Sequence, residues 1–232
     1  MNMNFGSYAC IITVIGPVGV GKSTQMRLMR NYLRSKKIRV SSTFIKSSHA
    51  LTYIIEKPLM LFGVYEAAPS EEGIIRIYLR RDVFARLLPL WCLLDALSIA
   101  TKFFFSVYIP FKLGFTVLIE EGLTMTLLTY GVIFPHLLKA NPRVPPLLLN
   151  LLSWIRKQNH VNVVLDATDD ELVRRRKSRS YRQNELMEYV TMQKKWIERL
   201  DSRDTIFIDT NGESIIRTHK KVLMELEKLR TG

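Results

Sequence analysis

Short apolar stretches alternate with longer amphipathic ones along this chain of 232 residues. The stretch that ends at Ile15 reads Cys-Ile-Ile-Thr-Val-Ile, a continuous β-branched run typical of a buried parallel strand. Similar runs predict strands at residues 9–15, 39–45, 115–119, 161–166 and 205–209. Apolar residues at helical spacing predict helices at residues 23–35, 73–105, 124–130, 146–157, 185–200 and 213–229. This alternation indicates an α/β fold, with a five-stranded parallel sheet flanked by helices on both faces.

Two long apolar runs bear on whether the chain crosses a membrane. Residues 103–119 are nearly all apolar, but Pro110 and Lys112 interrupt them, and the run is shorter than the ~20 residues that a span requires. We interpret it as a helix end, a turn at residues 110–114 and a buried strand. Residues 147–154 form a second apolar run that is too short as well. A large apolar interior or a subunit interface is favoured, and peripheral membrane contact is the weaker alternative.

Length, charge and cysteine content narrow the class of protein. A chain of 232 residues suits one α/β domain with a sizeable core, so we expect a single domain over residues 1–232. Cys10 and Cys92 form no metal-binding or disulfide spacing, and no cleavable leader is apparent, which favours a cytoplasmic location. The net charge of +13 calls for an anionic partner, and nucleotide phosphates, nucleic acid or an anionic membrane surface would all fit.

One motif fixes a chemistry. Residues 16–24 read GPVGVGKST, which fits the phosphate-binding loop G-x-x-x-x-G-K-[ST] between a strand and a helix. The glycines let backbone N–H groups turn toward a polyphosphate, and the helix N-terminus faces the same charge. Lys22 can bridge the β- and γ-phosphates of ATP, and the Ser23 hydroxyl can bind Mg²⁺. The residues predicted to bind nucleotide here are Gly16, Gly19, Val20, Gly21, Lys22, Ser23 and Thr24.

The ends of the second and third predicted strands carry further polar groups. The second strand leads to Lys46 and His49, where a second substrate could bind, although an ordinary polar loop is an equal alternative. The third strand ends in Glu120-Glu121, and a carboxylate there can hold a Mg²⁺-bound water or orient an attacking hydroxyl. Because neighbouring strand residues point to opposite faces, we expect only one of the two to face the crevice, and we choose Glu120.

A basic segment follows the fourth predicted strand. Six of the nine residues 174–182 are Arg or Lys and none is acidic. Such a segment repels itself until anions arrive, as expected of a lid that closes over phosphates, here at about residues 174–185. The alternative is a solvated or nucleic-acid-binding helix face. The phosphate loop makes the lid the preferred interpretation.

The order of these motifs resembles that of the thymidylate-kinase-like nucleoside and nucleotide kinases. That family runs from a GKST loop followed by Gln, through a strand ending in Asp-Arg and an arginine-rich lid, to a last strand with an adenine-side loop. The matching segments are residues 16–25, 119–121, 165–182 and 208–212, which extend over nearly the whole chain. The resemblance implies that lid arginines clamp the γ-phosphate and that the last loop lies near adenine. The residues so implied are Arg175, Arg179 and Arg182 in the lid, and Asn211 and Gly212 beside adenine.

The acceptor side departs from the family pattern. Glu120-Glu121 stands where the family has Asp-Arg, so a carboxylate replaces a phosphate-binding cation. A carboxylate beside an acceptor phosphate costs on the order of several kcal/mol unless other cations compensate, so the sequence predicts a divergent acceptor site in place of one for thymidine monophosphate. The family's acceptor-side positions correspond to Lys46, Asp95 and Tyr130 in this chain. Related kinases pair through helices near residues 96–111, so the resemblance is compatible with a homodimer through this region.

Three functions remain in competition. The leading hypothesis is a kinase that uses ATP and Mg²⁺ to phosphorylate a nucleoside, a nucleoside monophosphate or a related small acceptor. In it Lys22, Glu120 and the lid arginines are catalytic, and Ser23 and Glu120 hold the metal. The second is a phosphate-loop ATPase or nucleotide-binding module that acts with nucleic acid, a membrane surface or a protein, as the charge of +13 would allow. The third is a family member that binds nucleotide and does little chemistry.

Overall fold

A five-stranded parallel sheet organises the computed structural model, which describes residues 9–46, 65–68, 76–79, 81–133, 144–177, 190–191, 193–195, 197–198, 200 and 204–231. The strands are β1 (Ile11–Ile15), β2 (Val40–Ile45), β5 (Thr116–Glu121), β6 (His160–Asp166) and β7 (Thr205–Asp209). They run in the order β2-β5-β1-β6-β7, and every neighbouring pair is parallel. The predicted sheet is confirmed, and each strand lies within two residues of its predicted bounds.

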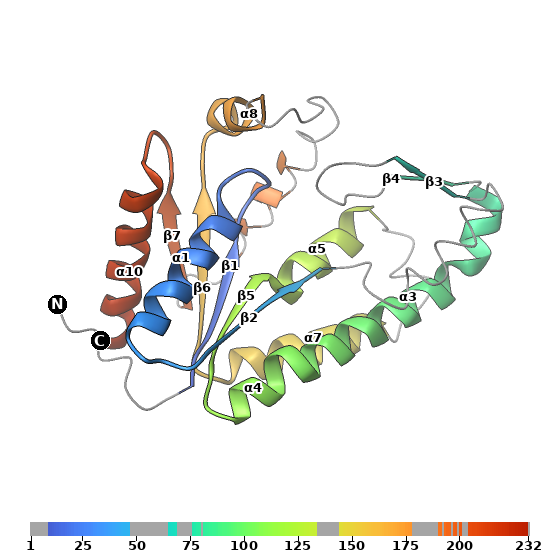
Figure 1. Cartoon of the computed structure of the whole chain (residues 1–232). Helices are drawn as coiled ribbons and strands as arrows, with labels where there is room; N and C mark the ends of the chain where they lie inside the picture. Colours follow the sequence, from blue (N-terminus) through green and yellow to red (C-terminus); the bar gives the residue numbers. More distant parts are fainter. Residues whose placement is uncertain are drawn as a thin grey trace.

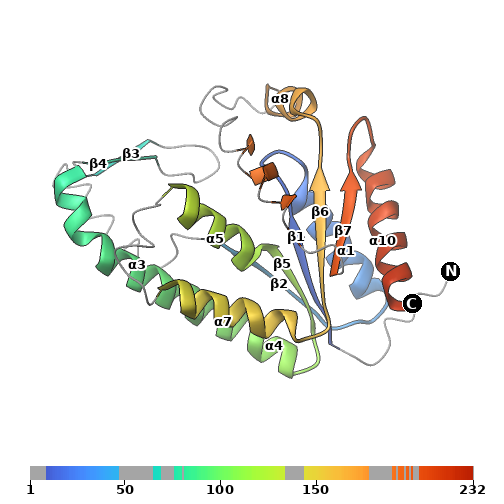
Figure 2. The ribbon, with the colours of Figure 1, turned by 180° about the vertical axis from the view of Figure 1, so that it is seen from behind.

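Helices cover both faces of this sheet (Figures 1 and 2). On one face α1 (Lys22–Ser35) and α10 (Ile215–Thr231) pack over Ile12, Val14 and their neighbours in the largest core cluster. On the other face α3 (Arg81–Phe103), α5 (Gly122–Ile133) and α7 (Val144–Arg156) enclose a second cluster that includes Ile11, Trp91 and Ile119. Strand β1 is therefore buried on both faces of the sheet, as the continuous apolar run of this strand predicts.

The helix predicted at residues 73–105 begins later than expected. Residues Arg76–Leu79 form a strand, β4, which pairs antiparallel with β3 (Tyr65–Ala68) in a small second sheet. Pairing with the strand that closely precedes it in sequence has outweighed the local helical pattern here. Ile77 and Tyr78 are residue types that favour strands, so the prediction of a helix at this point was wrong.

The same long helix also ends later than expected. A π-helical segment, η1 (Phe104–Tyr108), follows α3 and continues into α4 (Ile109–Lys112), so the chain turns at Leu113 and Gly114. The turn predicted to begin at Pro110 is wrong because this proline lies in the first turn of α4, where its missing N–H is tolerated.

One helix in the described part of the chain, Leu90–Lys112, is long and apolar enough to cross a membrane by length and composition. Its inner face packs in the core through Trp91, Ile99 and Phe103. Its opposite face exposes four large apolar side chains at near-helical spacing, which we call the outer row: Leu90, Leu93, Leu97 and Phe104. The helix is thus a core element with a second, exposed apolar face.

The segment after β6 leads to α8 (Asp169–Lys177), which carries the first part of the predicted lid. The remainder of that lid, with Arg179 and Arg182, lies outside the described residues, as does His49. Of the helix predicted at residues 185–200, the described positions 190–191, 193–195 and 197 are helical.

Candidate functional site

The phosphate-binding loop connects β1 to α1 at the carboxyl end of the central strand. Gly16 and Gly21 have φ values of 155° and 105°, and Gly21 is the residue just before α1. A Cβ atom at Gly16 would lie 2.3 Å from the backbone oxygen of Leu165 on β6. Gly16 therefore has to be glycine because the loop passes so close to the neighbouring strand.

Lys22 begins α1 and folds back over this loop. Its Nζ donates hydrogen bonds to the backbone oxygens of Gly16 at 2.9 Å and Pro17 at 3.1 Å. The same Nζ lies 3.4 Å from Oε1 of Glu121, and the Lys22 side chain is only 7% exposed. The ammonium group is thus held over the concave side of the loop, where Lys22 was predicted to meet phosphates.

Both carboxylates at the end of β5 contact the start of α1. Ser23 Oγ donates a 2.5 Å hydrogen bond to Oε1 of Glu120, while Glu121 pairs with Lys22. The expectation that only one of them faces the crevice was wrong. Glu121 has a φ of 65°, in the left-handed region, and this breaks the alternation of side chains along the strand.

Glu121 is the more buried of the two carboxylates. Its side chain is 6% exposed, and its second oxygen, Oε2, lies 3.7 Å from Nζ of Lys46 at the end of β2. Gly122 follows with a φ of 70°, and a Cβ there would come within 2.8 Å of the Thr13 methyl carbon. The two consecutive left-handed residues turn the chain sharply from β5 into α5.

The predicted metal ligands Ser23 and Glu120 are in direct contact. A hydroxyl and a carboxylate oxygen are the hard donors that Mg²⁺ prefers, and Mg²⁺ commonly takes one or two protein ligands with water and phosphate oxygens completing its shell. The described residues hold no cluster of three or more His, Cys, Asp or Glu side chains that could enclose a metal by themselves. The donor set therefore fits Mg²⁺ bound together with a phosphate substrate.

Arg175 on α8 joins three parts of the nucleotide side. Its guanidinium donates to the Val20 backbone oxygen at 3.3 Å, to Thr210 Oγ1 at 3.0 Å and to the Thr210 backbone oxygen at 2.6 Å. Its Nε donates to Glu171 at 2.8 Å. Hydrogen bonds from Arg174 and then Arg175 lower the pKa of Glu171 to about 2. Arg175 thereby links α8 to the phosphate loop and to the loop after β7.

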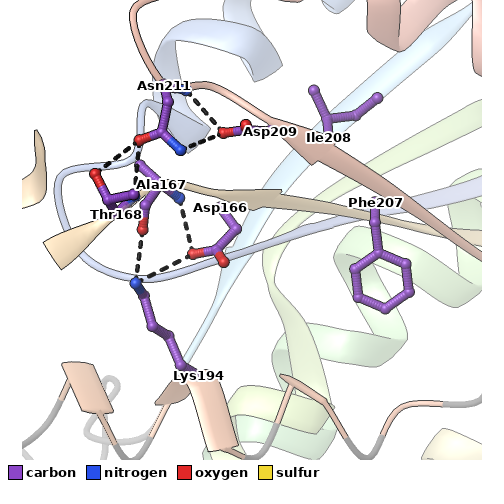
Figure 3. Close-up of a pocket in the computed structure, with 8 residues that line it drawn as sticks. All are labelled: Asp166, Ala167, Thr168, Lys194, Phe207, Ile208, Asp209 and Asn211. Carbon is purple, nitrogen blue, oxygen red and sulfur yellow. Dashed lines mark hydrogen bonds and ion pairs between the residues drawn. The ribbon is translucent and has the colours of Figure 1, made fainter.

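The loops after β6 and β7 are joined by a second network, shown in Figure 3. Asn211 Oδ1 accepts hydrogen bonds from the backbone N–H and the hydroxyl of Thr168, and Asn211 Nδ2 donates to Asp209. Lys194 Nζ donates hydrogen bonds to the Ala167 backbone oxygen and to Asp169 Oδ1, each at 2.6 Å. Thr168, Lys194, Asp209 and Asn211 border a pocket of about 390 Å³, which Phe207 also lines. Gly212 follows Asn211 with a φ of 59°.

The structure gives less information on two of the predicted acceptor residues, Asp95 and Tyr130. Asp95 lies on α3 and is fully buried, and burial together with this carboxylate raises the pKa of the Cys92 thiol to about 12. The backbone of Tyr130 lies in α5, but its side chain is outside the described part of the structure. Both assignments stay predictions.

Sequence reasoning missed several residues of the site. Thr210 and Lys194 have no local signal, because each is recognised only through a partner distant in the chain. Glu121 had a signal, since the Gly122 that follows it allows a left-handed turn.

A phosphate loop at the end of the central strand, a Ser–Glu pair beside it and an arginine-bearing helix above it define an α/β phosphate-loop nucleotide-binding fold. Among solved structures, the chain is similar to the thymidylate kinase from Ehrlichia chaffeensis, with a TM-score of 0.56 and 16% identity over 95% of this chain and 100% of that one. It is also similar to the thymidylate kinase from Candida albicans, with a TM-score of 0.51 and 13% identity over 96% of this chain and 93% of that one.

The sequence comparisons find nothing comparable. No protein-family model matches the chain, and no curated protein matches it either. At such low identity, the structural likeness establishes a thymidylate-kinase-like fold and leaves the activity open.

Proposed function

We propose that this protein is a kinase that transfers the γ-phosphoryl group of ATP, with Mg²⁺, to a nucleoside, a nucleoside monophosphate or a related small acceptor. The observation that carries the proposal is the contact of Lys22 and Ser23 with the two carboxylates at the end of β5. Phosphoryl transfer depends mainly on positioning and on charge stabilisation, and these four groups supply both signs of charge at one point.

Each group has a role that follows from its position. The backbone N–H groups of the loop would bind the β-phosphate, and Lys22 would exchange the Gly16 and Pro17 oxygens for phosphate oxygens. Ser23 and Glu120 would hold Mg²⁺, which when bound neutralises charge on the phosphate oxygens.

The nucleoside end of ATP would lie toward Asn211 and Gly212, on the β7 side of the loop. Arg175 would fix the lid helix against Val20, and we propose that Arg179 and Arg182 close over the γ-phosphate. Asp95 and Tyr130 remain candidate acceptor contacts. Cys10 and Cys92 lie in two separate clusters of the core, which fits the reducing cytoplasm that we propose as the location.

A product assay tests the proposal. Purified protein, Mg²⁺ and ATP labelled at the γ-phosphate are incubated with nucleosides, nucleoside monophosphates and 5′-hydroxyl oligonucleotides, and with no acceptor as a control. We expect label on one class of acceptor. Label that appears only as inorganic phosphate would instead support an ATPase.

A variant of Lys22 in this assay needs a second variant as a control for stability. Removing Lys22 alone leaves the buried Glu121 carboxylate with one cation fewer, and breaking a buried pair commonly costs about 3–5 kcal/mol. Lys22→Met combined with Glu121→Gln removes both charges and keeps the shapes. We expect transfer to be lost in Lys22→Met and in the double variant, and thermal stability to recover in the double variant. Unchanged turnover in either protein would contradict the role of Lys22.

The outer row, which runs along α3 and into η1, supports a proposal about assembly. Four exposed apolar side chains on one helix face suit a second copy packed along the same row, and we propose a homodimer through it. Leu93→Glu with Leu97→Glu should convert a dimer into a monomer in sedimentation analysis. A monomeric wild-type protein that binds anionic vesicles through this row would favour membrane contact instead. Salt-sensitive retention on DNA or RNA with stimulated ATP hydrolysis would favour the nucleic-acid alternative.

A further inference from the structure

The most unusual group in the site is the Glu121 carboxylate. It is a buried anion on a residue whose backbone is left-handed, a conformation that is uncommon for glutamate. Its Oε1 lies 3.4 Å from Lys22 Nζ and its Oε2 lies 3.7 Å from Lys46 Nζ. The backbone at this point is held in a costly conformation that directs the carboxylate between two cations, and this points to a function.

The sheet order places Glu121 on the side of the loop where transfer would occur. β5 lies between β1, which carries the phosphate loop, and β2, which ends beside Lys46. The proposed nucleoside end of ATP lies in the opposite direction, beyond β6, at Asn211. The terminal phosphate of ATP would therefore face β5 and β2, so Glu121 and Lys46 would border the acceptor.

The charges at this point disfavour a phosphate on the acceptor. The Glu121 carboxylate already pairs with both lysines, so neither ammonium is the isolated cation that a second phosphate would need. An acceptor phosphate next to Lys46 would also have to approach the carboxylate, and like charges brought together at a binding site repel strongly.

A neutral hydroxyl group, unlike a phosphate, can bind favourably to this carboxylate. Glu121 Oε2 is buried and accepts no hydrogen bond from any group in the described part of the chain. Buried acceptors are normally satisfied, and an O–H donor from a substrate would satisfy this one. The site is thus incomplete in a way that a neutral alcohol would complete.

We infer that the acceptor is a neutral nucleoside that presents its hydroxyl to Glu121, an inference that rests on the proposed function. The hydroxyl oxygen forms the new bond to the γ-phosphorus, and the bond from that phosphorus to the bridging oxygen of ADP breaks. The hydroxyl proton passes to the Glu121 carboxylate and then to water as the product leaves. The products are a nucleoside monophosphate and ADP, and Glu120 keeps its separate place beside Ser23.

The test compares each nucleoside with its own 5′-monophosphate as acceptor. Wild-type protein should show kcat/KM at least about a hundredfold higher for a nucleoside than for its monophosphate. Glu121→Gln keeps the shape and an acceptor oxygen but removes the charge and the proton acceptor. It should lower kcat/KM for the nucleoside about a hundredfold or more, and it should raise or maintain the value for the monophosphate.

Two controls make the outcome decisive. The ratio of the two kcat/KM values, measured on one preparation, does not depend on how much of a variant is folded. Glu225→Gln, which changes a partly exposed carboxylate on α10 that pairs with Lys228, should leave the ratio unchanged. A wild-type ratio that favours monophosphates, or a ratio unaffected by Glu121→Gln, would overturn the inference while leaving the kinase proposal in place. The absence of any labelled acceptor would overturn both.

Discussion

Replacing Arg175 should test whether α8, the proposed lid helix, is already fixed to the phosphate loop before any ligand binds. A lid arginine that acts only on the γ-phosphate would contribute little to the unliganded protein. In the structure, by contrast, the Arg175 guanidinium donates hydrogen bonds to Val20, Thr210 and Glu171. This one side chain therefore joins the phosphate loop, the loop after β7 and α8. Arg175→Ala should therefore destabilise the protein in the absence of nucleotide.

The expected size of the effect follows from the groups that lose a partner. Thr210 is 2% exposed, so water cannot readily replace the 2.6 Å bond from Arg175 to its backbone oxygen, which keeps a longer 3.3 Å hydrogen bond from the Glu213 N–H. A hydrogen bond from a charged donor to a buried acceptor is worth about 1.5–3 kcal/mol, and the longer bond to Val20 adds to this loss. The pair with Glu171 adds little because water screens it. The Arg175 side chain is 23% exposed, so solvent replaces only part of these bonds. We expect a loss of about 2–4 kcal/mol in the free energy of unfolding.

The neighbouring residue provides a matched control. Arg174 pairs with the same Glu171 carboxylate, but its side chain is 73% exposed. Arg174→Ala should have a much smaller effect on the free energy of unfolding, because water replaces most of what this exposed guanidinium loses. Urea unfolding of the three proteins, followed by far-UV circular dichroism, measures the difference, and the melting temperature of Arg175→Ala should fall by about 5–15 °C. Equal, small losses in the two variants would refute the proposed link between α8, the phosphate loop and Thr210.

Three further outcomes follow from single contacts. Gly16→Ala should abolish nucleotide binding in a filter or fluorescence assay, because the new Cβ would lie 2.3 Å from the Leu165 backbone oxygen. Glu120→Gln should raise the Mg²⁺ concentration for half-maximal activity by about tenfold or more, measured by Mg²⁺ titration at saturating ATP. Burial lowers the pKa of His160 from 6.5 to about 4, so the unfolded chain takes up the proton first as the pH falls. Stability that is fully present above pH 6.5 should fall by about 3 kcal/mol by pH 4, and His160→Gln should remove this component in urea titrations at the two pH values.

The sheet could be predicted from sequence because its signal is local. The central strand β1 is a continuous apolar run, and its two faces enter two different core clusters, as Ile11 and Ile12 show. The exceptions have a common physical cause. β4 depends on pairing with β3, and the helix continues past Pro110 because η1 and α4 provide a position where a proline fits. The local sequence pattern of β4 does not show its pairing with β3, and the pattern around Pro110 does not show that η1 precedes it.

The two halves of the site differed in how far sequence could predict them, and the reason lies in what performs the binding. The donor half is built from backbone groups of one short loop, so a contiguous motif specifies it, and Gly16 and Lys22 lie where that motif predicts. The proposed acceptor half is built from side chains at the ends of three different strands, with Lys46 after β2, Glu121 at the end of β5 and Lys22 after β1.

The direction of one side chain decides the charge of that acceptor half. Regular strand alternation would turn Glu121 away from Glu120 and leave Lys22 and Lys46 as two cations open to an acceptor phosphate. The left-handed φ of 65° instead brings the carboxylate between them. In sequence, Glu121 stands where the related kinases have an arginine, so the position looks like the loss of a cation. In the structure it supplies a buried carboxylate, and one oxygen of this carboxylate accepts no hydrogen bond within the described part of the chain. The acceptor of this phosphate-loop fold is therefore better inferred from that oxygen than from the fold itself.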